Sequence, residues 1–219
     1  MANQNGFLQN IPVVTRNLLY VNVIMFIATL INPTFMKGTF AMAFPLSQDF
    51  RWWQVITHMF MHDGFWHILF NMYSLVMFGM VVERVLGTKK FIIFYLVTGF
   101  GAVLLHTGVE FLEVQKLIAD YPGYSAQSIY NSIPHVLGAS GAVYGVLVAF
   151  AMLYPQAKLT LIFPPVTLDA KWWVIIFIGI ELITGITGTQ MGVAHFAHLG
   201  GALFGWLLIK YWRAKREIY

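Results

Sequence analysis

The sequence contains no cysteine and few charged residues of either sign. Without cysteine, the chain can form no disulfide and has no thiolate for catalysis. Only 10% of the residues are Asp, Glu, Lys or Arg, whereas soluble domains carry roughly 25%. Hydrophobic residues make up 58% of the 219 positions, and the mean hydropathy is +0.70. Because so little charge cannot cover a water-exposed surface, the composition predicts a polytopic membrane protein.

A cleavable signal peptide and an internal repeat are not apparent either. Residues 1–6 are polar and lack the basic stretch and apolar core of a signal peptide. The net charge of +4 comes from basic residues in short loops and tails, which indicates membrane topology and possible lipid contact rather than a nucleic-acid partner. We therefore expect a single membrane domain covering residues 1–219.

Six apolar runs have about the length that crosses a bilayer, roughly 20 residues. Turn or charge signals separate them, among them Asn32-Pro33, Pro164-Pro165 and Gly188-Thr189-Gln190. The segment 33–64 between the first two runs is rich in Trp and Phe, which is typical of an element in the membrane interface. The predicted spans lie near residues 14–32, 65–86, 89–112, 138–155, 172–189 and 193–212.

The basic residues predict an orientation for these spans. With the N-terminus in the cytoplasm, ten of the 13 Lys and Arg residues fall in inner segments, and Lys37, Arg51 and Lys116 fall in outer ones. This bias follows the positive-inside rule. An even number of spans returns the C-terminus to the cytoplasm.

Four polar side chains fall at one predicted depth. His67 and Asn71 lie in the first two turns of the second span, Ser140 in the first turn of the fourth, and His198 in the second turn of the sixth. All three spans run inward from the outer side. At 1.5 Å per residue, the four side chains lie within roughly 10 Å of the outer helix ends.

The chemistry of this group suits acyl transfer. The hydroxyl of Ser140 needs a base to become a nucleophile, and a neutral imidazole such as that of His198 can serve near neutral pH. The backbone N–H groups of Ala139 and Ser140 are unpaired at a helix start. His67 and Asn71, four residues apart on one helix face, add side-chain donors. These groups could together stabilise an oxyanion.

Glycines allow the fourth and sixth spans to approach closely. Gly141 and Gly145 form one small-xxx-small pair, and Gly201 and Gly205 form another. Gly138 permits the tight turn before Ser140. By itself, the Gly-Ala-Ser-Gly turn is also typical of simple helix packing.

Tyr144, one turn after Ser140, can stack on the imidazole of His198 and fix its orientation. Asp63 and Glu181 are the nearest acidic candidates for a third catalytic residue, but neither has a convincing position in the sequence. We interpret Glu181 as an interhelical hydrogen-bonding group. The prediction is therefore a Ser140–His198 dyad.

Two other kinds of site fit the sequence less well. His58, His62 and His67 could suggest a metal site, but the chain has no His-Glu-x-x-His motif and no suitable carboxylate, so no metal or cofactor is expected. His58 and His62 are interpreted as hydrogen-bonding groups of the outer segment. A small membrane transporter would explain the shared depth but not the turn at Ser140, and no inverted repeat is apparent.

The chain resembles the rhomboid intramembrane serine proteases, in their bacterial six-helix form. The resemblance covers roughly residues 50–210 and rests on four motifs in order. The motifs are Gly138-Ala139-Ser140-Gly141 with Tyr144, the His198-x-x-Gly201-x-x-x-Gly205 run, the His62/His67/Asn71 element, and Glu83-x-x-x-Gly87-x-x-Lys90.

The resemblance implies an all-α bundle of six transmembrane helices with Ser140 as nucleophile and His198, rather than His195, as base. It implies an oxyanion hole from His67, Asn71 and the backbone N–H of Ser140 and Ala139. Substrates would be single-span membrane proteins cut near the outer surface, entering beside the fifth span; the oligomeric state is left open. The alternative within the family is a catalytically silent binding or quality-control protein.

The sequence departs from the family pattern in two places. Family members often carry Trp-Arg in the first outer segment, where this chain has Trp53-Gln54. The second outer segment, residues 113–137, is longer than in minimal members.

Overall fold

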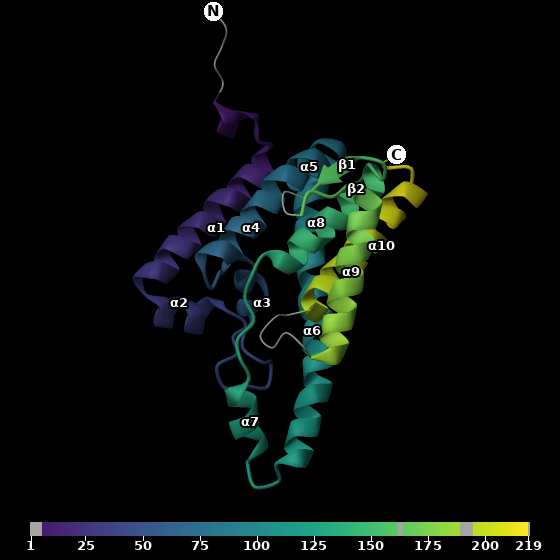
Figure 1. Ribbon diagram of the computed structural model, residues 1–219. Helices are drawn as coiled ribbons and strands as arrows, with labels where there is room; N and C mark the ends of the chain where they lie inside the picture. Colours follow the sequence, from purple (N-terminus) through teal and green to yellow (C-terminus); the bar gives the residue numbers. More distant parts are fainter. Residues whose placement is uncertain (1–5, 162–163, 189–194, 219) are drawn as a thin grey trace, which may run out of the picture.

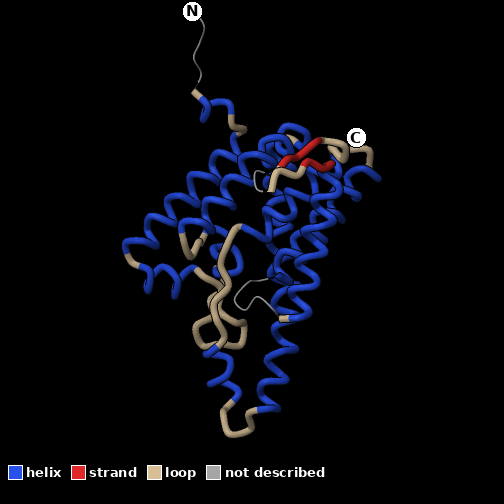
Figure 2. Tube along the Cα trace, viewed as in Figure 1, coloured by secondary structure: helices blue, strands red, loops and turns tan. Residues whose placement is uncertain are grey.

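The computed structural model describes residues 6–161, 164–188 and 195–218, and it is built almost entirely of helices (Figure 2). In chain order the elements are η1 (Phe7–Asn10), α1 (Val13–Ile31), α2 (Pro33–Phe40), α3 (Gln54–Thr57), η2 (His58–Phe60), α4 (Phe65–Ser74), η3 (Leu75–Gly79), α5 (Met80–Leu86), α6 (Thr88–Asp120), α7 (Ala126–Ser132), α8 (Ser140–Leu153), β1 (Lys158–Thr160), β2 (Thr167–Asp169), α9 (Ala170–Thr187) and α10 (His195–Ala214).

Four helical stretches are long and apolar enough to cross a membrane. They are Val13–Ile31, Phe65–Leu86, Thr88–Asp120 and Ala170–Thr187, and each matches one predicted span. The all-α membrane architecture is thus confirmed. The spans predicted at 138–155 and 193–212 correspond to α8 and α10, which do not meet the same criteria. Residues 189–194, which include parts of the last two predicted spans and of the turn at 188–190, lie outside the described residues.

Helix α8 is the centre of the bundle. It has 14 residues, and most of its side chains are buried. Because α6, α10, α9 and η3 all pack against it, α8 is covered by protein and does not need the full length of a lipid-exposed helix. The aromatic side chains of Phe91, Phe94 and Tyr95 on α6 complete the core beneath it and are fully buried.

Glycine contacts bring α8 and α10 together as the sequence predicts. A methyl group at Gly201 would fall on the carbonyl of Gly141, and one at Gly205 would lie 2.9 Å from the Cα of Gly145. Backbone contact of this kind sets the separation of the two helices. Because the separation of α8 and α10 is set in this way, the distance between side chains in their first turns is set as well.

The second predicted span is continuous but not uniform. A π-helical turn, η3, joins α4 to α5. Leu75 in this turn is fully buried, and Gly79 faces Leu75, Phe91 and the hydroxyl of Thr15. An extra residue in one turn rotates the following side chains about the helix axis, so α4 and α5 present different faces to the core.

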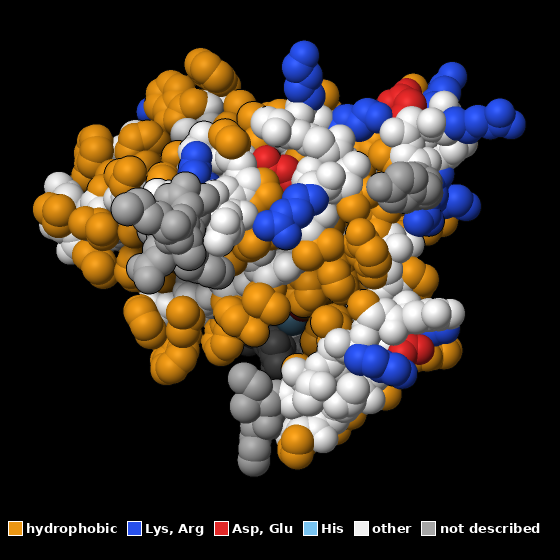
Figure 3. All heavy atoms as spheres, turned by 90° about the horizontal axis from the view of Figure 1, so that it is seen from above, with side chains coloured by type: hydrophobic (Ala, Val, Ile, Leu, Met, Phe, Trp, Pro, Cys, Tyr) orange, Lys and Arg blue, Asp and Glu red, His pale blue; other side chains and the backbone are white. Residues whose placement is uncertain are grey.

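Basic side chains gather at one end of the bundle. Helix α1 begins and α10 ends there, beside the β1–β2 hairpin (Figure 1). Figure 3 looks onto this end and shows Lys and Arg side chains spread over it, with hydrophobic side chains around the periphery. A charged end flanked by an apolar perimeter is typical of a protein that emerges from a bilayer.

Buried and paired charges hold this end together. Glu83, which is buried, accepts hydrogen bonds from the backbone N–H groups of Val14 and Thr15 and from the hydroxyl of Thr15. Its carboxylate therefore caps the first turn of α1. Lys90 forms an ion pair with Glu217 at 3.0 Å. The Glu83–Lys90 motif is thus structural, and it ties α1 and the C-terminal segment to the helices between them.

Two regions between the predicted spans contain regular secondary structure. Helix α6 continues to Asp120 instead of ending near residue 112, and α7 follows it, so that both project beyond the bundle (Figure 1). Phe44, Val114 and Ile129 form a small separate core that joins this projection to the first outer segment. Between α8 and α9, Lys158–Thr160 pairs antiparallel with Thr167–Asp169, a hairpin that the sequence analysis does not predict.

Candidate active site

The chain enters α8 through a turn that only glycine adopts easily. Gly138 has a φ of +131°, and a methyl group there would lie 2.9 Å from Nε2 of His67. The N–H of Gly138 donates to the carbonyl of His58 at 2.9 Å, which anchors the turn to the outer segment. Helix α8 then begins at Ser140. The first N–H groups of a helix have no intrahelical acceptor, so the turn presents the hydroxyl of Ser140 beside free donors.

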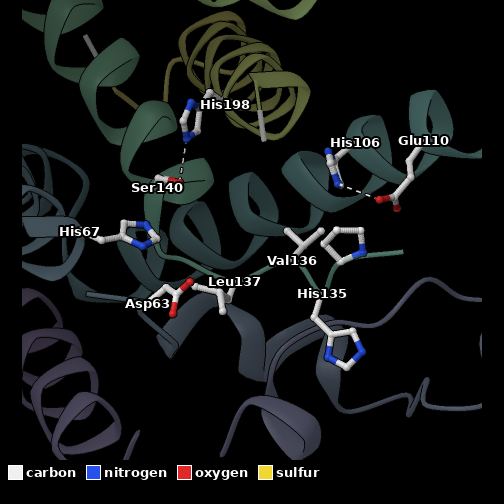
Figure 4. Close-up of a pocket in the computed structure, with 10 residues that line it drawn as sticks. Asp63, His67, His106, Glu110, His135, Val136, Leu137, Ser140 and His198 are labelled. Carbon is white, nitrogen blue, oxygen red and sulfur yellow. Dashed lines mark hydrogen bonds and ion pairs between the residues drawn. The ribbon is translucent and has the colours of Figure 1, made fainter. Parts of the chain in front are cut away.

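Ser140 and His198 are in direct contact. The Oγ of Ser140 lies 2.8 Å from Nε2 of His198 (Figure 4). His198 is in the first turn of α10 as the structure describes it, and the glycine contacts between α8 and α10 bring the two side chains level. The pair that the sequence singles out is therefore assembled, although the two residues are 58 positions apart.

Tyr144 holds the imidazole of His198 from one face. The two rings are stacked, with centroids 4.4 Å apart and an interplanar angle of 5°. The phenol O–H of Tyr144 donates to Oε1 of Glu181 at 2.5 Å. The stacking that the sequence predicts is thus present, and the hydroxyl adds a contact that the sequence does not suggest.

The position of Glu181 corrects the sequence-based interpretation that no acidic residue is placed beside His198. The sequence offers no convincing position for a third acidic group, yet Oε1 of Glu181 lies 2.9 Å from Nδ1 of His198. The contact is close without being aligned as a linear hydrogen bond. Asp63, the other candidate, is paired with Lys37 instead. The sequence could not place Glu181 because the rotation of α9 against α10 depends on packing.

Glu181 also binds the second candidate base. Nδ1 of His195 lies 2.6 Å from Oε2 of Glu181 and 3.2 Å from the hydroxyl of Thr184. His195 is buried and contacts α9 rather than Ser140. The choice of His198 over His195 agrees with this geometry. The interhelical role expected for Glu181 is confirmed, since its carboxylate joins α9 to both α8 and α10.

The predicted oxyanion donors are not equally placed. His67 lines the same cavity as Ser140 and points into it (Figure 4). Asn71 is buried one turn further along the helix, where its amide donates to the carbonyl of His67 at 2.9 Å. Asn71 does not line the cavity. In this state His67 and the backbone at Ser140 are the donors nearest to the serine hydroxyl.

A cavity of about 580 Å³ opens over Ser140 and His198. Its wall combines α6 with the segment that follows α7, so residues 134–137 of the second outer segment form part of the site. Seven of its ten lining residues are polar or charged, and among them Nε2 of His106 lies 3.6 Å from Oε1 of Glu110 (Figure 4). The lining residues are Asp63, His67, His106, Glu110, Pro134, His135, Val136, Leu137, Ser140 and His198.

His58 and His62 are buried behind this cavity. Nδ1 of His58 bonds the carbonyl of Gln54 at 2.9 Å, as expected for a structural group. His62 packs edge-on against the ring of His67, and its ring nitrogens have no hydrogen-bond partner in the described part of the chain. Burial lowers the pKa of His58 to about 4 and that of His62 to about 3. Both rings are therefore neutral at physiological pH.

The described residues contain no group of three or more His, Asp, Glu or Cys side chains arranged to hold a metal ion. The histidines nearest to one another are accounted for by other contacts. His62 packs edge-on against His67, and His195 binds Glu181.

The side chain of Gln54 holds the first outer segment together. Its side chain is fully buried. The amide oxygen accepts from the N–H groups of Ala43 and Arg51, and the amide nitrogen donates to the carbonyls of Gly38 and Asp49. A neutral side chain thus satisfies four backbone groups between the end of α2 and residue 51 without burying a charge. The indole of Trp53 adds a bond to the carbonyl of Thr39 at 2.9 Å.

Comparisons with known proteins agree with these motifs. A family model described as Rhomboid domain matches residues 49–215. The rhomboid protease AarA of Providencia stuartii is 28% identical over 167 residues, which cover 75% of this chain and 57% of that protein. Rhomboid protein 1, mitochondrial, of Saccharomyces cerevisiae is 30% identical over 74% of this chain and 44% of that protein.

A human relative, presenilin-associated rhomboid-like protein, mitochondrial, is 30% identical over 69% of this chain and 36% of that protein. The chain therefore spans between about a third and three fifths of the length of these relatives. The relatives come from both bacteria and mitochondria.

Proposed function

The chain belongs to the rhomboid family, and on that premise we propose that it is an active intramembrane serine endopeptidase with Ser140 as nucleophile and His198 as general base. The observation that carries the proposal is the 2.8 Å contact between Oγ of Ser140 and Nε2 of His198. A silent family member that acts only by binding has no need of this contact.

The reaction follows from the positions of these atoms. Nε2 of His198 accepts the proton of the Ser140 hydroxyl as Oγ attacks the scissile carbonyl carbon. The carbonyl oxygen becomes an oxyanion beside the imidazole of His67 and the N–H groups of Ser140 and Ala139. His198 then returns its proton to the leaving amine, and the peptide C–N bond breaks to give an acyl-enzyme.

Water completes the cycle. A water molecule in the polar cavity loses its proton to His198, and its oxygen attacks the acyl carbon. The bond to Oγ breaks, and the proton passes back to Ser140. The amide of Asn71 donates to the carbonyl of His67 outside the cavity, so its supporting donor role in both halves of the reaction requires the amide to turn toward the oxyanion.

The proposed substrate class depends on how deep Ser140 and His67 lie in the membrane. Ser140 is the first residue of α8, and His67 is the third residue of α4, so at 1.5 Å per residue both lie within roughly 10 Å of one end of the bundle. We assign this end to the outer membrane face, with both termini on the cytoplasmic side of a bacterial inner membrane. The substrates are then single-span membrane proteins cut near that face, where a helix can unwind and expose its peptide bonds.

The test is cleavage of a single-span reporter by the purified protein in detergent and in lipid vesicles. Wild type should cut the reporter near one end of its span, and Ser140→Ala should abolish the cut. Ser128→Ala, at an exposed position on α7, is the matched control and should retain full activity. A folded wild type that binds the reporter without cutting it would establish the silent, binding function instead.

A further inference from the structure

We propose that Glu181 is a positioning residue for His198, which makes the site a Ser140–His198–Glu181 arrangement rather than an isolated pair. The proposal rests on the proteolytic function proposed above. It assigns to α9 a direct part in the chemistry, through a carboxylate that reaches the base from a neighbouring helix.

The first argument is the position of the carboxylate on the ring. His198 faces Ser140 through Nε2 and Glu181 through Nδ1. These two nitrogens lie on opposite sides of an imidazole, and a neutral ring carries a proton on one of them only. A carboxylate beside Nδ1 favours the tautomer with its proton there. Nε2 is then left with the lone pair that must accept the serine proton.

The second argument is how firmly the carboxylate itself is held. The side chain of Glu181 is 10% exposed, and each of its oxygens has a fixed partner. Oε1 accepts from the hydroxyl of Tyr144 at 2.5 Å, and Oε2 contacts Nδ1 of His195 at 2.6 Å. These two contacts leave Oε1 directed at His198. Tyr144 therefore supports the base twice, through its ring and through Glu181.

The third argument concerns charge. An ionisable group inside an apolar span is costly and needs a compensating role. When His198 takes the proton of Ser140 it becomes an imidazolium, and a carboxylate 2.9 Å away stabilises that charge in surroundings of low dielectric constant. The imperfect alignment of the present contact is common in unliganded sites, where catalytic hydrogen bonds tighten only as charge develops.

A purely structural role of Glu181 would also explain its contacts between α8, α9 and α10. The experiment must therefore separate a structural role from a positioning role. The variant is Glu181→Gln, which keeps the shape and can still accept from Tyr144 but removes the charge. The measurements are kcat and KM for a transmembrane reporter, the rate of covalent labelling by a fluorophosphonate, and the thermal midpoint in detergent. Glu113→Gln, an exposed position on α6, is the matched control.

We expect Glu181→Gln to lower kcat by at least about 100-fold, since the corresponding loss of charge in a Ser-His-Asp triad lowers kcat by about 10⁴-fold, with KM within about twofold. The labelling rate should fall in parallel, while the final labelled fraction stays the same. Because the rate is measured on molecules that do become labelled, misfolded protein does not enter it. Glu113→Gln should match wild type.

The proposal is overturned if Glu181→Gln lowers the thermal midpoint or the labelled fraction but leaves the labelling rate and kcat of the folded molecules unchanged. That result would make Glu181 a structural link only, and the proposed protease function would stand. Absence of cleavage and of labelling in wild type would instead remove the protease function itself.

Discussion

The phenol ring of Tyr144 and the imidazole of His198 lie parallel, 4.4 Å apart, with their planes 5° from each other. Stacking of this kind contributes about 0.5–1.5 kcal/mol beyond simple burial, and it limits rotation of the base. The contact depends on the ring, whereas the bond to Glu181 depends on the hydroxyl. The two contributions can therefore be separated by mutation.

Tyr144→Phe keeps the ring and removes the hydroxyl, so it should lower kcat by less than about tenfold, in line with the loss of one hydrogen bond. Tyr144→Leu removes both and should lower kcat further, with KM changed little in either variant. Steady-state cleavage of a transmembrane reporter measures the difference. An equal loss of kcat in Tyr144→Phe and Tyr144→Leu would show that the ring contact contributes nothing.

Replacement of the two histidines of α10 should have unequal effects. His198→Ala removes the proposed base and should lower kcat by at least about 10³-fold. His195→Ala removes one partner of Glu181 but leaves the contact between Ser140 and His198, so a loss within about tenfold is expected. Cleavage assays on both purified variants test this. A His195→Ala loss as large as that of His198→Ala would contradict the assignment.

Covalent labelling should identify the nucleophile directly. A fluorophosphonate forms a stable bond to an activated serine oxygen, so wild type and the control Ser128→Ala should label, and Ser140→Ala should not. Mass spectrometry of the labelled protein should place the adduct on the peptide that contains Ser140. An adduct that persists in Ser140→Ala would rule out this serine.

The contact between α8 and α10 should tolerate no methyl group. Gly201→Ala places a Cβ on the carbonyl of Gly141, and we expect it to destabilise the fold by at least about 2 kcal/mol. Gly179→Ala is the control, because nothing lies within 4 Å of its added Cβ and alanine favours a helix. Thermal unfolding followed by tryptophan fluorescence should show a lower midpoint for Gly201→Ala and an unchanged or higher one for Gly179→Ala.

Acid should destabilise the protein through His58 and His62. Burial lowers the pKa of His58 from 6.5 to about 4 and that of His62 to about 3, so the unfolded chain binds protons more readily than the folded one. The two neutral rings make their full contribution to the free energy of unfolding above pH 6.5. This contribution is lost progressively as the pH falls towards 4. The thermal midpoint should therefore drop between pH 7 and pH 5.

His62→Phe tests the origin of this pH dependence. The ring of His62 makes an edge-on aromatic contact with His67, which phenylalanine can reproduce without a titrating group. The variant should show a flatter decline of the thermal midpoint between pH 7 and pH 5 than wild type. An identical decline would place the effect at other groups.

Much of the site could be predicted from the sequence because its determinants are local. Gly138 and Ser140 are adjacent in a turn, and the spacing from His198 to Gly201 and Gly205 fixes which histidine faces α8. The length of each hydrophobic run predicts the position of a helix, and for this reason the sequence predicts an end near residue 112 for α6, which continues to Asp120. Residues 113–120 are too polar to count as a span, yet they continue the helix outside the apolar region and are fixed there by Val114.

Glu181 and Gln54 could not be placed in the same way. The position of Glu181 depends on the rotation of α9 about its axis, and α9 is too uniformly apolar for its periodicity to determine that rotation. A sequence signal did exist, since a carboxylate in an apolar span usually has a specific partner. Gln54 is read as a missing arginine in the sequence, whereas its four backbone bonds arise only when residues 38–51 fold around it.

Most large side chains along α9 are exposed, including Ile176, Ile180 and Ile183, and apolar contacts of that kind can slide. The carboxylate of Glu181 cannot slide, because it is bonded to α8 and α10 at the same time. An outward movement of α9 would therefore have to break the bond from Tyr144 and the contact with His195, and it would also withdraw the carboxylate from His198. Under the two proposals made above, the reactivity of Ser140 is thus coupled to the position of α9.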